Sequence, residues 1–272
     1  MPPTQFRARV TDNRSLTGGY FVLTMQSQGE GAPPLAEVTP GQFVMLRPQA
    51  WDRDLLNPRA FSVLDADADG TFSVLLKAYG RGTTAMKGMH PGDAITVTGP
   101  LGQGFAPTRA DGPTQLLVAG GVGLPPLHLQ ARRAAAAGVG GKLQMLYGGR
   151  DADDLVLLDD LKAWGIATQL ATEDGSVGDK GFVTVALARR IEKAQQDGEA
   201  IEILSCGPTP MLRAVRTLAL DRGVTAWLCL EEQMACGFGV CLGCAVPVYG
   251  EKPYRYCCTD GPVFDAREVR WS

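Results

Sequence analysis

Alternating apolar and polar residues dominate the first hundred residues of the chain. Short runs rich in β-branched and aromatic residues are separated by turn residues such as Thr17-Gly18-Gly19 and Ala68-Asp69-Gly70, a pattern typical of antiparallel strands. The predicted strands are Phe6–Val10, Tyr20–Met25, Gln42–Leu46, Arg59–Leu64, Thr71–Ala78 and Ala94–Thr98. Six short strands at this spacing predict a small antiparallel barrel.

The hydrophobic period changes near Gln115, where short apolar runs begin to alternate with helical stretches. The predicted strands are Leu116–Ala119, Leu143–Tyr147, Ile166–Ala171, Ile201–Ser205 and Ala226–Leu230. The predicted helices between them are Leu127–Ala137, Leu155–Trp164, Thr184–Gln195 and Pro210–Asp221. This alternation predicts an α/β domain with a five-stranded, doubly wound parallel sheet.

Length and composition set limits on the class of protein. A chain of 272 residues has room for two domains with cores and a small appendage, which we expect at residues 1–108, 109–230 and 231–272. The net charge of −3 argues against a nucleic-acid binder. Membrane-spanning apolar runs and signal-peptide features at Met1–Gln5 are both lacking. We therefore expect a cytoplasmic protein that binds neither membrane nor nucleic acid.

Five of the seven cysteines lie close together near the end of the chain. Cys236, Cys241 and Cys244 have the spacing C-x4-C-x2-C, and the pair Cys257-Cys258 follows at a distance. This is the plant-type arrangement for a 2Fe-2S cluster, in which one loop supplies three thiolates and a remote cysteine the fourth. Because adjacent side chains in an extended segment point in opposite directions, only one of the last two should reach.

The glycines of this loop suit the same chemistry. Gly237, Gly239 and Gly243 can adopt positive φ and so aim backbone N–H groups at the sulfurs of an anionic cluster. A structural zinc site is one alternative, but zinc cysteines usually come as two short knuckles. Disulfide bonds are a second alternative, although three cysteines within nine residues, with glycines between them, are poorly placed to cross-link a fold.

Two segments of the predicted barrel are candidates for binding a flavin. In Arg59-Ala60-Phe61-Ser62, the guanidinium suits a pyrophosphate, the aromatic ring offers a flat face, and the hydroxyl can reach ring heteroatoms. Gly80-Arg81-Gly82-Thr83-Thr84 follows a strand directly and could cradle phosphate at a helix start. The alternative for the first segment is an ordinary strand whose arginine extends to solvent, and the alternative for the second is a plain turn.

Glycine-rich turns follow three of the five strands in the α/β region. Ligands of such sheets bind outside the carboxyl ends of the strands. Those ends carry Gly120–Gly123, Gly148-Gly149-Arg150, Thr172-Glu173-Asp174, Cys206-Gly207-Pro208 and Glu231-Glu232. The first is an incomplete dinucleotide fingerprint, because Pro126 stands where a third glycine is expected, so a glycine turn without a ligand stays open as an alternative.

These parts together predict a bridge between two-electron and one-electron chemistry. A nicotinamide exchanges two electrons as hydride and a 2Fe-2S cluster exchanges one, so a flavin is needed to convert between them. We prefer NAD over NADP, because Arg150 is followed by Asp151, Asp153 and Asp154, which would repel a 2′-phosphate.

The order of motifs resembles a known family. A barrel with R-x-aromatic-S followed by G-G-x-G and C-G-P resembles the ferredoxin–NADP reductase superfamily. Met234–Cys244, read as M-x-C-G-x-G-x-C-x-G-C, and Cys258–Phe264, read as C-x-D-G-P-V-F, look specifically like the electron-transfer subunits of type B dihydroorotate dehydrogenases, the PyrK family. Val118–Pro126 and Asp174–Val183 match too, so the resemblance covers nearly the whole chain. Arg-Ala-Phe-Ser departs from the Arg-Pro-Ile-Ser frequent in that family.

The resemblance implies the following site residues. FAD would be held by Arg59, Ala60, Phe61, Ser62, Leu75, Leu76, Lys77, Gly82 and Thr83. The cluster would be ligated by Cys236, Cys241, Cys244 and Cys258, with Cys257 a bystander. The nicotinamide would dock near Gly121, Gly123, Cys206, Gly207 and Pro208.

The resemblance also implies a partner. A separate catalytic subunit with FMN would oxidise dihydroorotate, and electrons would cross the 2Fe-2S cluster and FAD to NAD+ in pyrimidine biosynthesis. We expect an obligate heterotetramer with two copies of each subunit and the cluster loop close to the interface. No residue of this chain is expected to act on dihydroorotate itself. The alternatives are a reductase component of another oxidoreductase complex and a non-enzymatic zinc-bearing interaction module.

Overall fold

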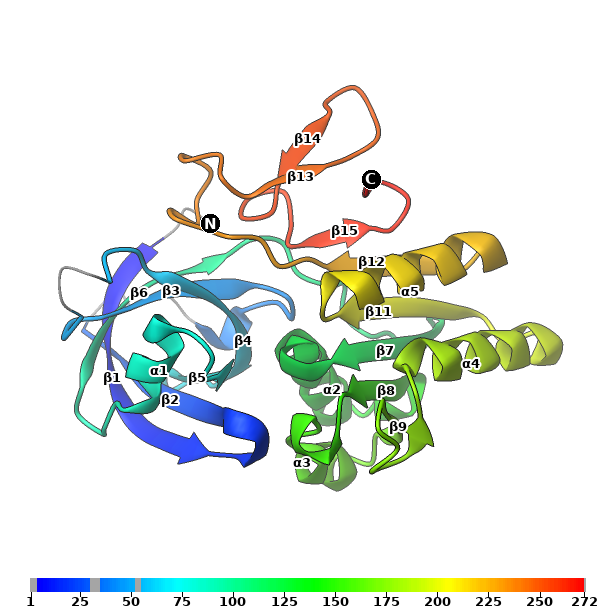
Figure 1. Ribbon diagram of the computed structural model, residues 1–272, viewed down its shortest axis with the longest axis horizontal. Coiled ribbons are helices and arrows are strands. Elements are labelled where there is room, and N and C mark those ends of the chain that lie inside the picture. Colours follow the sequence, from blue (N-terminus) through cyan, green and yellow to red (C-terminus); the bar gives the residue numbers. More distant parts are fainter. Residues whose placement is uncertain (1–3, 30–34, 52–54, 272) are drawn as a thin grey trace.

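The computed structural model describes residues 4–29, 35–51 and 55–271. It contains a barrel, a parallel sheet covered by helices, and a C-terminal segment that lies across both (Figure 1). No helix in the described part of the chain is both long and apolar enough to cross a bilayer.

The N-terminal strands close into the predicted six-stranded antiparallel barrel. They are β1 (Thr4–Ser15), β2 (Tyr20–Gln28), β3 (Phe43–Pro48), β4 (Arg59–Ala66), β5 (Thr71–Lys77) and β6 (Ala94–Leu101). Their order around the barrel is β1-β2-β5-β4-β3-β6, and β1 pairs with β6 to close it. Alternation places Phe6, Ala8 and Val10 of β1 in the core while their neighbours face solvent. The short helix α1 (Arg81–Lys87) links β5 to β6.

All five strands predicted for the α/β region are present and parallel, and two more join them. The sheet contains β7 (Thr114–Gly120), β8 (Leu143–Gly149), β9 (Ala167–Thr172), β10 (Asp179–Lys180), β11 (Ile201–Cys206), β12 (Thr225–Cys229) and β15 (Val263–Asp265). Their order is β10-β9-β8-β7-β11-β12-β15. β15 runs antiparallel to β12, so the C-terminal segment covers the edge that β12 would otherwise expose. The prediction of five strands was therefore too low.

Helices cover both faces of this sheet, as a doubly wound domain requires. They are α2 (Leu124–Ala136), α3 (Leu158–Ala163), α4 (Val183–Asp197) and α5 (Thr209–Arg222). Alternate side chains of β7 separate the two faces. Leu116 and Val118 pack in one apolar cluster with residues of α4 and α5, and Leu117 and Ala119 pack in another with α2.

Two helix starts differ from the predictions by three residues, each for a local reason, and the other two by one residue. α2 begins at Leu124 rather than Leu127, because Pro125 and Pro126 occupy the first helical turn, where a missing N–H costs nothing. α3 begins at Leu158 rather than Leu155. The side chain of Asp151 accepts from the Asp154 N–H and caps a 3-10 turn, and Leu157 then takes a left-handed conformation before the helix.

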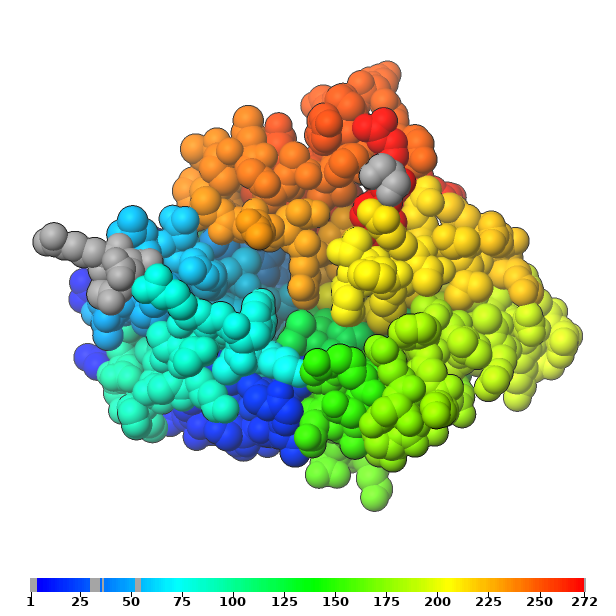
Figure 2. Space-filling model, viewed as in Figure 1, coloured from blue at the N-terminus to red at the C-terminus, as the bar shows by residue number. Residues whose placement is uncertain are grey.

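The C-terminal segment joins the barrel to the sheet. It adds a hairpin, β13 (Ala245–Pro247) with β14 (Tyr254–Tyr256), before β15. Figure 2 shows this orange-to-red segment lying along the upper side of the blue-to-cyan barrel and meeting the yellow residues of α5. One apolar cluster contains Phe43 and Met45 of the barrel, Leu228 of the sheet and Cys258 of this segment, so the three parts share a core.

Candidate functional site

Strands β4 and β5 stop pairing part-way along the barrel, and we call their unpaired stretch the flavin opening. They pair only from Val63 to Ala66 on β4 and from Phe72 to Val74 on β5. The preceding residues of β4, Arg59–Ser62, pair with β3 on their other edge. The following residues of β5, Leu75–Lys77, pair with β2. The two segments expected to hold FAD therefore face each other, and none of their described backbone pairings joins them.

Arg59 forms one end of this opening together with two residues distant in sequence. Its guanidinium carbon lies 5.5 Å from the ring centroid of Trp51. A Cβ on Gly82 would lie 3.3 Å from Arg59 Nε and 3.5 Å from the Trp51 ring, so a larger residue here would crowd the Arg59 guanidinium. The indole N–H of Trp51 is buried without a hydrogen-bond partner among the described residues. An acceptor such as a phosphate oxygen would satisfy it.

The other flavin candidates differ in what their side chains can offer. Ala60, Phe61 and Ser62 are half-buried on β4. Leu75 and Leu76 are buried in the protein core, so only their backbone groups face the opening. The Thr83 hydroxyl accepts from the N–H groups of Tyr79 and Gly80, 3.2 Å from each. Lys77 forms an ion pair across the domain boundary. The sequence does not indicate Trp51 as a candidate for the flavin site, because it lies in a loop without a regular hydrophobic pattern.

The expected nicotinamide residues converge where β7 and β11 end side by side. Cys206 pairs in register with Ala119, which brings the turn after β7 against Cys206-Gly207-Pro208. Gly121 has a φ of +51°. A Cβ on Gly123 would lie 2.3 Å from the carbonyl oxygen of Cys206. Glycine is thus required here for close backbone packing, and the two turns form one surface at the carboxyl edge of the sheet.

A buried thiol and a carboxyl group lie behind this surface. A hydrogen bond with Cys229, together with complete burial, holds the pKa of Cys206 well above its ordinary value, so its thiol stays neutral. The Glu231 carboxylate, just after β12, raises that pKa further. The Glu231 side chain is exposed, but nearby protein atoms partly desolvate its carboxyl group and raise its pKa. The sequence placed Glu231 at a strand end but did not indicate its proximity to Cys206.

The four cysteines expected to ligate the cluster approach one another as two pairs. The Sγ atoms of Cys244 and Cys258 are 3.2 Å apart. The backbone N–H of Cys241 points at Cys236 Sγ, with nitrogen and sulfur 3.4 Å apart. A two-iron cluster with four thiolates takes two on each iron, which this pairing suits. Within the described ranges, no three His, Cys, Asp or Glu side chains are arranged to hold a single metal ion.

Backbone N–H groups surround the sulfurs as an anionic cluster requires. Although partial burial raises the pKa of Cys236, the N–H groups of Cys241, Phe238 and Val240 and the Cys241 side chain lower it to about 6. The Gly239 N–H donates to Cys258 Sγ over 3.2 Å. Burial and the neighbouring Cys244 raise the pKa of Cys258 to about 12. Two thiolates so close repel each other, and bound iron would remove that repulsion.

Cys257 faces away from its neighbour. Its side chain is fully buried, and its thiol donates to the carbonyl of Leu230 with sulfur and oxygen 3.4 Å apart. Burial raises the pKa of Cys257 strongly, so it stays a thiol. Of the two adjacent cysteines, Cys258 is the one whose thiol lies beside another expected ligand, Cys244.

The cluster loop, residues 234–244, lies directly against β3 and β6 of the barrel. A Cβ on Gly237 would lie 2.6 Å from Met45 Cγ and 3.2 Å from Leu101 Cδ1. Met45 pairs in register with Ala60 of Arg59-Ala60-Phe61-Ser62. One residue of β3 thus separates the loop from the strand that carries the flavin motif.

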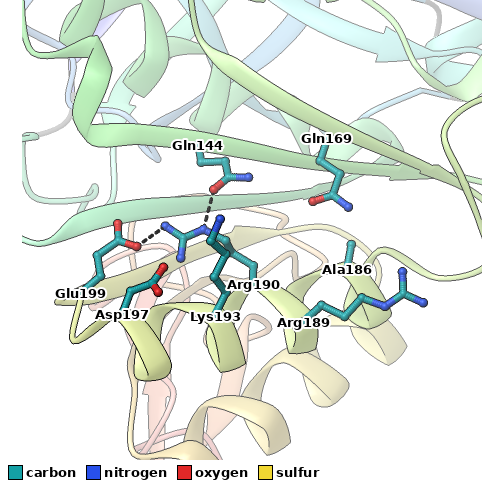
Figure 3. A pocket seen from close by; sticks show the side chains of 8 residues that line it. All are labelled: Gln144, Gln169, Ala186, Arg189, Arg190, Lys193, Asp197 and Glu199. Atoms are coloured by element: carbon teal, nitrogen blue, oxygen red, sulfur yellow. Dashed lines mark hydrogen bonds and ion pairs between the residues drawn. The ribbon is translucent and has the colours of Figure 1, made fainter.

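A pocket of about 560 Å³ lies away from these groups. It is lined by residues of α4, by Gln144 and Gln169 of the sheet, and by Glu199. Figure 3 shows Arg190 bridging Gln144 and Glu199 across it. None of the expected site residues lines this pocket, and two of its charged residues, Arg190 and Glu199, pair with each other.

Family models match three successive parts of the chain. Residues 17–105 match an oxidoreductase FAD-binding domain, residues 117–217 an oxidoreductase NAD-binding domain, and residues 231–270 the iron-sulfur cluster binding domain of dihydroorotate dehydrogenase B.

Curated relatives match along nearly the whole length. The chain is 35% identical over 267 residues to the electron transfer subunit of dihydroorotate dehydrogenase B (NAD(+)) of Caldanaerobacter subterraneus subsp. tengcongensis, covering 97% of this chain and 98% of the relative. It is 38% identical to the Bacillus velezensis subunit of the same name, covering 91% and 93%. The solved structure of the NADH-dependent reduced ferredoxin-NADP oxidoreductase aligns with a TM-score of 0.80 and 28% identity, covering 97% of this chain and 90% of that one.

Proposed function

We propose a residue-level route for electrons through this chain, which belongs to the family of dihydroorotate dehydrogenase B electron transfer subunits. Electrons from the catalytic subunit pass through the 2Fe-2S cluster and FAD to NAD+, in pyrimidine biosynthesis. The three proposed units, residues 1–108, 109–230 and 231–272, divide this work between FAD, NAD and the cluster.

The contact between the cluster loop and the barrel carries the proposal. FAD, when bound, exchanges an electron pair with nicotinamide and single electrons with the cluster. Gly237 packs on Met45, the β3 partner of Ala60, so the proposed cluster and flavin sites are near neighbours. Met45, Cys244 and Cys258 also pack in one buried apolar cluster.

Arg59 is proposed to bind the FAD pyrophosphate. Its planar guanidinium can donate two parallel hydrogen bonds to phosphate oxygens, and Gly82 leaves room for them. The Arg59 guanidinium stacks over the Trp51 ring. The unpartnered indole N–H of Trp51 could donate a further hydrogen bond to the pyrophosphate. Ala60, Phe61 and Ser62 would line one wall of the flavin opening. The free backbone edge of Leu75–Lys77 would line the other.

Gly121, Gly123 and Cys206-Gly207-Pro208 are proposed to bind the nicotinamide nucleotide. Their close-packed glycines let backbone N–H groups approach phosphate, and the neutral Cys206 thiol adds no charge. A preference for NAD follows from the pairing of Arg150 with Asp154 at 2.6 Å. With that cation engaged, the carboxylates of Asp151 and Asp153 would repel a 2′-phosphate.

The outer surface of the cluster loop is proposed to bind the FMN-containing catalytic subunit. Phe238, Val240 and Leu242 are 45, 72 and 53% exposed, and they lie beside Cys236 and Cys241, the more exposed cluster cysteines. A cluster of exposed apolar side chains is typical of a protein interface. Docking here would bring the partner's flavin close to the cluster, in a heterotetramer with two copies of each subunit. The free cysteines suit the reducing conditions of the cytoplasm.

Freshly isolated protein tests the cofactor assignment directly. We expect flavin and iron-sulfur absorption bands, with one FAD, two irons and two sulfides for each chain. A colourless, zinc-containing protein would contradict it. Co-purification separates the candidate partners: binding of a dihydroorotate dehydrogenase catalytic chain supports the proposal, and binding only of another oxidoreductase component would overturn it.

A further inference from the structure

Asp154 connects the barrel to the nucleotide-binding domain through a buried carboxylate. Its side chain is only 6% exposed. Lys77 Nζ at the end of β5 lies 2.5 Å from Asp154 Oδ1. The Tyr20 hydroxyl, on the neighbouring strand β2, donates to the same oxygen over 3.3 Å. Lys77 also lies 4.3 Å from the centroid of the Tyr20 ring. Two barrel residues therefore hold one carboxylate of the other domain.

The same carboxylate is tied to its own domain at the carboxyl end of β8. Arg150 donates to it from Nε over 2.6 Å and from Nη2 over 3.0 Å. Tyr147 lies 3.0 Å from the carbonyl oxygen of Asp154 and 3.3 Å from that of Gly121. A Cβ on Gly121 would lie 3.2 Å from the Tyr20 hydroxyl. The network therefore reaches the turn that carries Gly121.

The charges of this network favour a fixed arrangement. Hydrogen bonds from Arg150 and Lys77 outweigh burial and hold the pKa of Asp154 far below its ordinary value. Burial raises the pKa of Tyr20. The ionised carboxylate and the neutral phenol thus persist across physiological pH. Removing the carboxylate would leave Lys77 without its anionic partner and weaken this contact between the two domains.

We propose that Asp154 is a positioning residue for hydride transfer, which fixes the Gly121 turn against the flavin opening by holding Lys77 and Arg150 together. The inference rests on the proposed nucleotide and flavin sites. Lys77 ends the β5 edge that lines the flavin opening, and Gly121 belongs to the nucleotide turn. Hydride transfer requires reacting atoms about 3–3.5 Å apart, and a displacement near 1 Å costs roughly 100-fold in rate.

Rapid-mixing measurements on the whole, FAD-loaded chain test this proposal. Flavin reduction by NADH, followed over a range of concentrations, gives an apparent dissociation constant and a limiting rate. We expect Asp154→Asn and Lys77→Met to lower the limiting rate roughly 10- to 100-fold, while Lys77→Arg restores most of it. The double variant should lose little more than either single variant, because the pair acts as a unit.

A matched control and a second readout separate positioning from general damage. Glu199→Gln removes an ion pair of 2.6 Å inside the nucleotide domain and should leave the limiting rate unchanged. Hydrogen exchange at the amides of residues 121–124 should accelerate in Asp154→Asn and Lys77→Met, and exchange in the cluster loop should not. If Asp154→Asn fails to fold, the limiting rates of Lys77→Met and Lys77→Arg test the positioning role instead.

The outcomes distinguish this proposal from the proposed function. Unchanged limiting rates in both Lys77→Met and Asp154→Asn would overturn the positioning role. A parent protein that NADH cannot reduce would instead contradict the nucleotide site. In that case faster exchange at residues 121–124 would still support the connection between the domains, and unchanged exchange would overturn it.

Discussion

At the scale of single residues, the two adjacent cysteines give the sharpest test of the cluster site. Cys258 Sγ lies 3.2 Å from Cys244 Sγ, whereas the Cys257 thiol donates to the carbonyl of Leu230. We expect Cys258→Ser to lose most of the iron and the visible absorption of the cluster, because one thiolate of a pair is removed. Cys257→Ser is the matched control and should keep both. Equal cluster content in the two variants would refute the ligand assignment.

Arg59 gives a second prediction, for the affinity of FAD. Arg59→Met removes the charged hydrogen bonds proposed for the pyrophosphate but keeps the length of the side chain. Such bonds contribute about 1.5–3 kcal/mol, so the dissociation constant of FAD should rise roughly 10- to 100-fold, measured by flavin fluorescence titration. Arg47→Met on β3 removes a hydrogen bond to the Leu56 carbonyl outside this corner and should leave it unchanged. An unaltered affinity in Arg59→Met would place the pyrophosphate elsewhere.

The roles of residues could be predicted where their spacing along the chain determines what they can bind. The cysteine spacing and the alternation of neighbouring side chains were sufficient to expect that only one of Cys257 and Cys258 would reach the cluster. Lys77 was different. The family resemblance implied a contact with FAD for Lys77. Its ion-pair partner, Asp154, lies in another domain, and no local sequence pattern indicates such a pairing.

At the scale of elements, the turn after β7 depends on a contact between two backbones. We expect Gly123→Ala to destabilise the fold by roughly 1–3 kcal/mol, because its Cβ would overlap the Cys206 carbonyl oxygen and force the two strand ends apart. It should also weaken NADH binding, measured alongside thermal unfolding. Gly141→Ala is the control, since its Cβ meets no atom within 4 Å. Equal stability and NADH affinity in the two variants would contradict the close packing.

The spacing of hydrophobic residues predicted most helices and strands. It did not predict which strands pair, or over what length. Alternation of apolar and polar residues located all six barrel strands, and short apolar runs between helical stretches located the five parallel strands. It could not indicate that β4 and β5 separate beyond Val63 and Val74, although this divergence creates the proposed flavin opening. It also missed β15, whose three residues gain their strand conformation by pairing with β12.

At the scale of the whole molecule, the surface of the cluster loop offers the last prediction. Phe238, Val240 and Leu242 are exposed on a loop whose backbone is occupied with the cluster sulfurs, so nothing within the described chain explains their apolar character. We expect Val240→Asp and Phe238→Asp to weaken binding of the catalytic subunit roughly 10-fold or more, because a charge would be desolvated at the interface. Association measured by surface plasmon resonance tests this.

A control at a remote site makes that test specific. Val185 is 49% exposed on α4, on the part of the molecule that carries the 560 Å³ pocket, and Val185→Asp adds the same charge there. It should leave association unchanged. All three variants should retain the visible spectrum of the cluster, because their side chains point into solvent. Normal association of Val240→Asp and Phe238→Asp would show that the partner approaches another face. Electrons would then need a longer path from the partner's flavin to the cluster.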